Sequence, residues 1–198
     1  EPGVEILDPC TGTGTYVTEL IEYLPPDKLE HKYKHEIHCN EVAILPYYIA
    51  NLNIEFTYQQ KMGNYEEFKN ICLVDTLDHC TFEGQQFDLF AMSVQNTTRI
   101  SEQNAKDISV IIGNPPYNSS GNVATGNTIW QLFTRKALNE WLIPKGYLVF
   151  VHPSGWRKPK NDNSKYNGLF QLMTKENQML YLVIQGLKDG RKVFNCGT

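Results

Sequence analysis

The sequence lacks any long hydrophobic run. No stretch of its 198 residues approaches the roughly 18 consecutive apolar residues that mark a membrane-spanning helix. The opening EPGVEILDPC lacks the basic and apolar segments of a signal peptide. These absences exclude an integral membrane protein, and we expect a soluble, cytoplasmic protein with no membrane partner.

Cysteine is scarce and never paired as C-x-x-C. The five cysteines are odd in number and scattered, which disfavours both a disulfide framework and a zinc site. We therefore expect reduced thiols and no metal. His–Cys neighbours at 38–39 and 79–80 resemble metal half-sites, but adjacent residues on a strand point to opposite faces, so chance explains them better.

Arginine is absent from the first 98 residues. This half has five lysines against 16 acidic residues, a net charge of −11, whereas residues 99–198 have 13 basic and six acidic residues, a net charge of +7. The overall charge of −4 argues against a nucleic-acid partner, because phosphate binding needs Lys and Arg. The asymmetry indicates either a basic nucleic-acid surface on the second half or unevenly distributed solvated charge.

Internal repeats and low-complexity tracts are also absent, and short β-rich runs alternate with helical patterns. We expect strands near residues 4–7, 36–40, 71–74, 110–112, 147–151 and 180–184, and a possible short one at 87–92. This alternation predicts an α/β fold with an open, doubly wound, mostly parallel, Rossmann-like sheet. Ligands of such sheets bind beyond the carboxyl ends of the strands, at the switch point.

Four segments between these strands have helical patterns. Apolar residues recur at helical spacing in 17–24, before two prolines, and on one face of 44–52. A third helix is expected over 128–142 and a short one near 169–173. The third is expected to bury the apolar residues Ile129, Leu132, Phe133, Ala137 and Trp141. Residues 78–107 are polar and give no clear pattern apart from the possible strand.

A glycine-rich turn, DPCTGTGTY, follows the first expected strand. Its glycines allow the backbone to approach a ligand closely, which indicates a cofactor-binding turn. It is not a phosphate-binding loop, because no G-K-[ST] follows, and the third glycine of the dinucleotide fingerprint is missing. A single G-x-G also occurs in ordinary tight turns.

Acidic residues end the next two strands. Glu41 follows the second strand and Asp75 the third, so both are expected to face the same cleft. Carboxylates there can accept hydrogen bonds from ribose hydroxyls or an adenine amino group. Each alone is equally well explained as a helix cap or loop acid; the two in register favour a ligand site.

The most specific signal is Asn114-Pro115-Pro116-Tyr117 at the end of the fourth strand. The two prolines have fixed φ and no N–H, so the segment is stiff. The Asn114 side-chain oxygen and the Pro115 carbonyl are free to accept, and two acceptors aimed at one exocyclic amino group favour the positive charge that develops during its methylation. Tyr117 offers a face on which a planar base can stack.

Together, DPCTGTGTY and NPPY resemble the gamma-type N6-adenine DNA methyltransferases, in which a D-P-x-x-G-T-G-x-F turn precedes N-P-P-Y. The surrounding sequence is most similar to the methyltransferase domains of type ISP restriction-modification enzymes, over roughly residues 4–156. The resemblance implies a class I methyltransferase fold, S-adenosylmethionine as cofactor and DNA as partner. Tyr16 replaces the usual Phe.

The resemblance also implies a role for each motif. The turn, with Asp8, Pro9, Thr11, Gly12 and Gly14, would hold the methionine part of S-adenosylmethionine. Glu41 would bind its ribose and Asp75 its adenine. Asn114, Pro115, Pro116 and Tyr117 would form the catalytic motif that holds a flipped-out adenine. The family also has a second aromatic that stacks on the other face of this base; the sequence does not identify it, and Phe194 in KVFNCGT is only a guess.

A basic segment follows the fifth expected strand. Arg157, Lys158 and Lys160 form the densest positive cluster and are expected to contact DNA, although a solvated loop explains them too. The family also has a cofactor-closing helix before the first strand and a target-recognition domain after the last. We therefore expect 1–198 to be a methyltransferase catalytic domain from a longer protein, with a nuclease, helicase or recognition domain attached.

Two other functions remain open. N-P-P-Y also occurs in methyltransferases that act on a glutamine amide in release factors or on guanine in RNA, although those usually have D-x-G-T-G-S-G. A non-catalytic nucleic-acid-binding module with a methyltransferase fold is the second alternative. A module without catalytic activity would have no chemical reason to keep both motifs intact.

Overall fold

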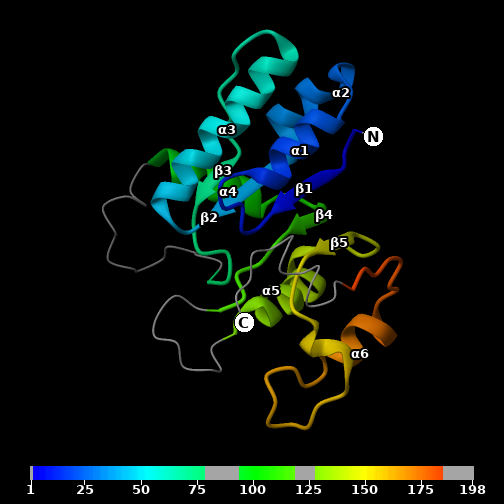
Figure 1. Cartoon of the computed structure of the whole chain (residues 1–198). Coiled ribbons are helices and arrows are strands. Elements are labelled where there is room, and N and C mark those ends of the chain that lie inside the picture. Colours follow the sequence, from blue (N-terminus) through cyan, green and yellow to red (C-terminus); the bar gives the residue numbers. More distant parts are fainter. Residues whose placement is uncertain (1, 79–93, 119–127, 185–198) are drawn as a thin grey trace. The chain divides into compact units, whose positions relative to one another are not determined.

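The computed structural model describes residues 2–78, 94–118 and 128–184. The chain divides into two compact units, Glu1–Pro153 and Ser154–Thr198. The first contains the sheet and both sequence motifs, and the second contains the basic segment (Figure 1). In the described part of the chain, no helix is long and apolar enough to cross a membrane.

A five-stranded, all-parallel sheet forms the centre of the first unit. The strands are β1 (Glu5–Asp8), β2 (Ile37–Glu41), β3 (Ile71–Leu73), β4 (Ile108–Gly113) and β5 (Tyr147–Phe150), in the order β3-β2-β1-β4-β5. The chain moves outward from β1 to β3, then returns to the other side of β1 for β4. The switch point therefore lies between β1 and β4, and the predicted α/β, doubly wound fold is confirmed.

Helices cover both faces of this sheet. They are α1 (Thr15–Tyr23), α2 (Pro26–His31), η1 (Lys32–Glu36), α3 (Ile44–Met62), α4 (Val94–Asn104), α5 (Trp130–Lys136) and η2 (Ala137–Trp141). Helices α1 and α3 pack on one side, and α5 lies on the other (Figure 1). Pro26 starts α2 at the position where its missing N–H costs nothing.

The main core lies between α1, α3 and the strands β2 and β3. Val17 and Ile21 of α1 meet Ile54 and Tyr58 of α3, and all four are almost fully buried. Tyr33 stacks on Tyr58 with ring centroids 3.9 Å apart. A smaller core on the other face joins β1 and β4 to η2. These cores fix the strands whose carboxyl ends carry the site.

Helix α3 differs from its sequence pattern. The predicted apolar face within 44–52 is exposed, and Leu52 has 66% of its surface accessible. The face that packs on α1 is instead formed by Ala50, Ile54 and Tyr58. The helix has apolar residues on both sides, so periodicity alone does not identify the buried one.

The helix expected over 128–142 forms as α5 and η2, with Phe133 and Ala137 buried as predicted. The predicted burial of Leu132 is wrong, because 44% of its surface is exposed. Trp130 takes its place in the core and is fully buried. The polar helix α4 was not predicted, and the possible strand at 87–92 lies outside the described residues.

Over its described residues, 154–184, the second unit is mostly irregular. It contains η3 (Ser154–Arg157), α6 (Leu169–Gln171) and η4 (Leu172–Glu176), so the predicted short helix near 169–173 is confirmed. The predicted strand at 180–184 is wrong: this segment pairs with no strand among the described residues, and its side chains are exposed. Its apolar, β-prone composition does not suffice without a backbone partner.

Candidate active site

The glycine-rich turn leaves β1 at the switch point. Gly12 has a φ of +59° and Gly14 one of +89°, both in the left-handed region that favours glycine. A Cβ on Gly14 would lie 3.3 Å from the Cα of Ala50, so this glycine lets the turn touch helix α3. A Cβ on Gly12 would meet nothing within 4 Å. The backbone at Gly12 therefore borders open space.

Glu41 joins this turn to the end of β2. One carboxylate oxygen accepts a hydrogen bond from the Gly12 amide at 2.8 Å, and the other accepts from the Ala43 amide at 2.7 Å. The Thr11 amide donates to the Asn40 carbonyl at 2.9 Å. Glu41 is nearly buried, yet each carboxylate oxygen keeps a further lone pair for a ligand hydroxyl.

The end of β3 is tied to the same place. The Val74 amide donates to the Glu41 carbonyl at 2.9 Å, and the Thr76 hydroxyl donates to the Pro9 carbonyl at 2.7 Å. The Asp75 carboxylate accepts from the Leu77 amide at 3.0 Å, which fixes its own turn. Hydrogen bonds thus bring together the three strand ends that the sequence predicts to share a cleft.

Asp8 lies beneath the turn and is 1% exposed. Its Oδ1 accepts from the Cys10 amide at 3.1 Å, whereas its Oδ2 has no hydrogen-bond partner among the described residues. Burial raises the pKa of Asp8 to about 7; the Cys10 amide opposes this rise and the charge of Glu41 adds to it. A cation bound nearby would favour the ionised form.

The Asn114–Tyr117 segment leaves β4, the neighbour of β1. Asn114 and Pro116 are exposed, Pro115 is buried and Tyr117 is half-buried. The segment is held at both ends by the backbone. The Val151 amide donates to the carbonyl of Gly113 at 3.0 Å, and the Ile129 amide donates to the carbonyl of Tyr117 at 3.2 Å.

The two motifs touch through Cys10 and Gly113, for which the sequence analysis predicts no role. Burial raises the pKa of the Cys10 thiol well above its ordinary value, and the nearby backbone amide of Asn114 opposes this rise. A Cβ on Gly113 would lie 3.2 Å from Asp8 Oδ1 and 3.3 Å from Cys10 Sγ. Gly113 therefore allows the two turns to approach. Its position directly before Asn114 is the signal that could have identified it.

The basic segment belongs to the second unit. Arg157, Lys158 and Lys160 are exposed, and together with Ser154 and Gly155 they line a cavity of about 500 Å³. Trp156, directly before Arg157, is buried. Their predicted contact with DNA stays a prediction.

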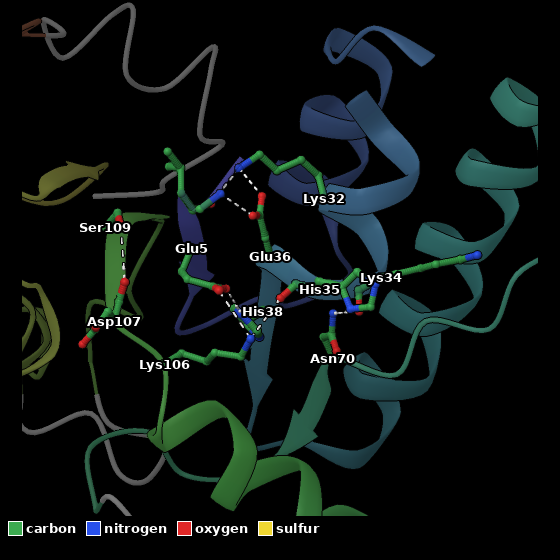
Figure 2. Close-up of polar contacts among 12 residues, drawn as sticks. Glu5, Lys32, Lys34, His35, Glu36, His38, Asn70, Lys106, Asp107 and Ser109 are labelled. Atoms are coloured by element: carbon green, nitrogen blue, oxygen red, sulfur yellow. Dashed lines mark hydrogen bonds and ion pairs between the residues drawn. The ribbon is translucent and has the colours of Figure 1, made fainter. Parts of the chain in front are cut away.

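The opposite, amino-terminal edge of the sheet has a polar network (Figure 2). His38 Nε2 lies 2.7 Å from Glu5 Oε2, and Lys106 Nζ lies 3.3 Å from Glu5 Oε1. Burial lowers the pKa of His38. The next residue, Cys39, packs in the core on the other face of β2, so the 38–39 pair splits as expected. His79 and Cys80 lie outside the described residues.

Comparison with known proteins adds a family and a fold. The family described as Eco57I restriction-modification methylase matches residues 30–194. No match was found among curated proteins. The cryoEM structure of a DrdV–DNA complex matches this chain with 45% sequence identity and a TM-score of 0.68. The match covers 79% of this chain and 18% of the DrdV chain.

Two further structures share the fold. One is a nuclease-deletion mutant of the Type ISP restriction-modification enzyme LlaGI in complex with a DNA substrate mimic. It matches with 28% sequence identity and a TM-score of 0.68, and the match covers 80% of this chain and 16% of the LlaGI chain. The M protein of the Type I restriction enzyme EcoKI, at 18% identity and a TM-score of 0.50, covers 78% of this chain and 31% of its own. The chain thus spans less than a fifth of DrdV and LlaGI.

Proposed function

Because the chain belongs to the Eco57I restriction-modification methylase family, we propose that it transfers a methyl group from S-adenosylmethionine to the N6 amino group of adenine in DNA. One observation carries this proposal. The glycine-rich turn and the Asn114–Tyr117 segment lie against each other at the switch point, where a Cβ on Gly113, directly before Asn114, would lie 3.2 Å from Asp8 Oδ1 and 3.3 Å from Cys10 Sγ. A methyl donor and a methyl acceptor need this adjacency.

The residues of the turn fit the cofactor. S-adenosylmethionine supplies an electrophilic methyl group on a sulfonium, and it also has an ammonium group. The buried Asp8 carboxylate, with one oxygen lacking a partner in the described chain, provides negative charge beside such a cation. The open space at Gly12 leaves room for close approach to the backbone. The methionine part would lie along Asp8, Pro9, Thr11, Gly12 and Gly14.

The two strand-end acids would hold the rest of the cofactor. Glu41 would accept hydrogen bonds from the ribose hydroxyls through the lone pairs that Gly12 and Ala43 leave unused. Asp75 would accept from the adenine amino group through Oδ2, since its Oδ1 accepts from Leu77. Both sets of contacts hold the cofactor in place beside β4.

The catalytic motif would hold the target base. The exposed Asn114 side chain and the Pro115 carbonyl would accept the two hydrogens of the adenine amino group, which turns the nitrogen lone pair toward the methyl group. Their partial negative charge stabilises the positive charge that develops on this nitrogen. Buried Pro115 and exposed Pro116 keep the segment stiff, and Tyr117 would stack on the base.

DNA is the proposed partner, with the target adenine flipped out of the duplex. The similar DrdV and LlaGI structures are complexes with DNA or a DNA mimic, which supports DNA over RNA or a protein glutamine. An adenine inside a duplex does not reach such a site, so the base must leave the stack. The lengths of these neighbours support an attached nuclease, helicase or recognition domain in the full-length protein.

A methylation assay tests the proposal. The full-length protein would be incubated with labelled S-adenosylmethionine and, separately, with duplex DNA, RNA and a release factor. The DNA would then be digested to deoxynucleosides, and we expect the label in N6-methyl-2′-deoxyadenosine only. Label in cytosine, RNA or protein would contradict the substrate, and absence of cofactor binding would favour a non-catalytic binding module.

A further inference from the structure

Two elements hold the ends of the Asn114–Tyr117 segment. The amide of Val151, directly after β5, binds the carbonyl that precedes Asn114 at 3.0 Å. The amide of Ile129, directly before α5, binds the carbonyl of Tyr117 at 3.2 Å. The separation between the two ends of the segment therefore depends on how β5 and α5 are held relative to each other.

The residues next to these two anchors stack on each other. Trp130 follows Ile129 and His152 follows Val151, and their rings are nearly parallel, with an interplanar angle of 7° and centroids 4.8 Å apart. Trp130 is fully buried. Burial lowers the pKa of His152, so the ring stacks in its neutral form at neutral pH, and its Nδ1 lies 3.0 Å from the Pro153 carbonyl.

We propose that the Trp130–His152 stack is a positioning element that fixes the distance between Asn114 and Tyr117, and thereby places the target base. This inference rests on the proposed function, because the segment must hold a base for its placement to matter. The stack closes a ring of contacts that runs from Gly113 through Val151, His152, Trp130 and Ile129 to Tyr117. Neither ring touches the base in this proposal.

The geometry explains why such an element is useful. Asn114 must meet the edge of the base while Tyr117 meets its face, and the prolines between them keep the segment stiff. A shift at either anchor therefore moves one contact relative to the other. Misplacement of a reacting group by about 1 Å costs on the order of a hundredfold in rate.

The test compares three variants of the full-length enzyme. His152→Ala removes the stack, His152→Phe keeps a flat ring against Trp130, and His35→Ala is a matched control at the exposed, opposite edge of the sheet. We expect His152→Ala to lower kcat about ten- to hundredfold with an unchanged Kd for the cofactor. His152→Phe should restore kcat to within about threefold, and His35→Ala should match wild type.

A second measurement does not depend on activity. Hydrogen exchange in apo protein should be faster in His152→Ala at the amides of Ile129 and Val151, and restored in His152→Phe. Failure of wild type to methylate adenine would refute the proposed function, while the exchange data would still test the stack. Unchanged exchange and kcat in His152→Ala, or a His152→Phe variant as impaired as His152→Ala, would overturn the inference.

Discussion

The backbone amide of Asn114 lies near the sulfur of Cys10 and opposes the rise in the pKa of this thiol, so the Asn114–Tyr117 segment and the glycine-rich turn meet at this pair of residues. Cys10→Val removes the acceptor at similar volume, so we expect it to lower the free energy of unfolding by about 1 kcal/mol, the net value of a typical hydrogen bond. Cys10→Ser keeps an acceptor and should be milder. Denaturant unfolding measures both, and equal stabilities would show that the contact contributes nothing.

Glu41 accepts hydrogen bonds from two backbone amides, so the effect of replacing it depends on whether the new side chain can still accept both. Glu41→Ala should weaken cofactor binding by about 1.5 to 3 kcal/mol, the cost of losing a charge-assisted hydrogen bond. Glu41→Gln should be nearly as harmful, because its NH2 group would face the donor amide of Gly12 or Ala43. Calorimetry measures the affinity, with exposed Glu19→Ala as control. Unchanged affinity would remove Glu41 from the site.

Asn114 is exposed at the end of β4, where no cofactor contact is proposed. Asn114→Ala should therefore reduce methylation by about a hundredfold or more while leaving cofactor affinity largely intact, because one preorganised acceptor is lost. Tyr117→Phe should be mild, since stacking needs the ring and not the hydroxyl. Single-turnover assays of the full-length enzyme measure both. Near-normal turnover in Asn114→Ala would refute the catalytic assignment.

The buried Asp8 should make stability depend on pH. Burial raises its pKa from 3.8 to about 7, so between these values the unfolded chain loses this proton while the folded chain keeps it. The free energy of unfolding should therefore fall across this window, by up to about 4 kcal/mol relative to Asp8→Asn, and this difference should stay constant above it. Denaturant unfolding at about pH 4 and about pH 8 measures it; parallel pH profiles would contradict the shift.

The basic segment gives a prediction about salt. Replacing Arg157, Lys158 and Lys160 together with alanine should weaken binding to all DNA sequences alike and make the salt slope shallower by up to about three units. Cofactor binding should not change. Exposed Lys69→Ala in the first unit serves as the control. Binding titrations at several salt concentrations that superimpose on those of wild type would refute DNA contact here.

The sequence predicted the sheet because short β-prone segments alternate with helical patterns along the chain. The strand bounds differ by at most two residues at either end, and the doubly wound order brings both motifs to one switch point. Sequence patterns do not predict contacts between residues that are far apart in the chain. The link between Cys10 and Asn114, and the room that Gly113 provides, depend on β1 and β4 being neighbours.

The failures have physical causes as well. Helix α4 is mostly polar, and of its 11 residues only Asn96, Ile100 and Gln103 are buried, so no apolar stripe marks it. Asn96 holds the edge of β3 through the Leu73 amide and carbonyl, at 2.9 and 3.0 Å. A buried polar side chain thus holds helix α4 against β3, whereas a search for helical periodicity looks for apolar side chains in that role.

The close approach of Gly14 to Ala50 couples the hydrophobic core to the turn that is proposed to hold the cofactor. Helix α3 begins three residues after Glu41, so its position against α1 also sets where the Glu41 carboxylate lies. A larger residue at position 50 would push the helix outward and pull the acid away from the Gly12 amide. A substitution at this fully buried position of helix α3 would therefore be detected first as a loss of cofactor affinity.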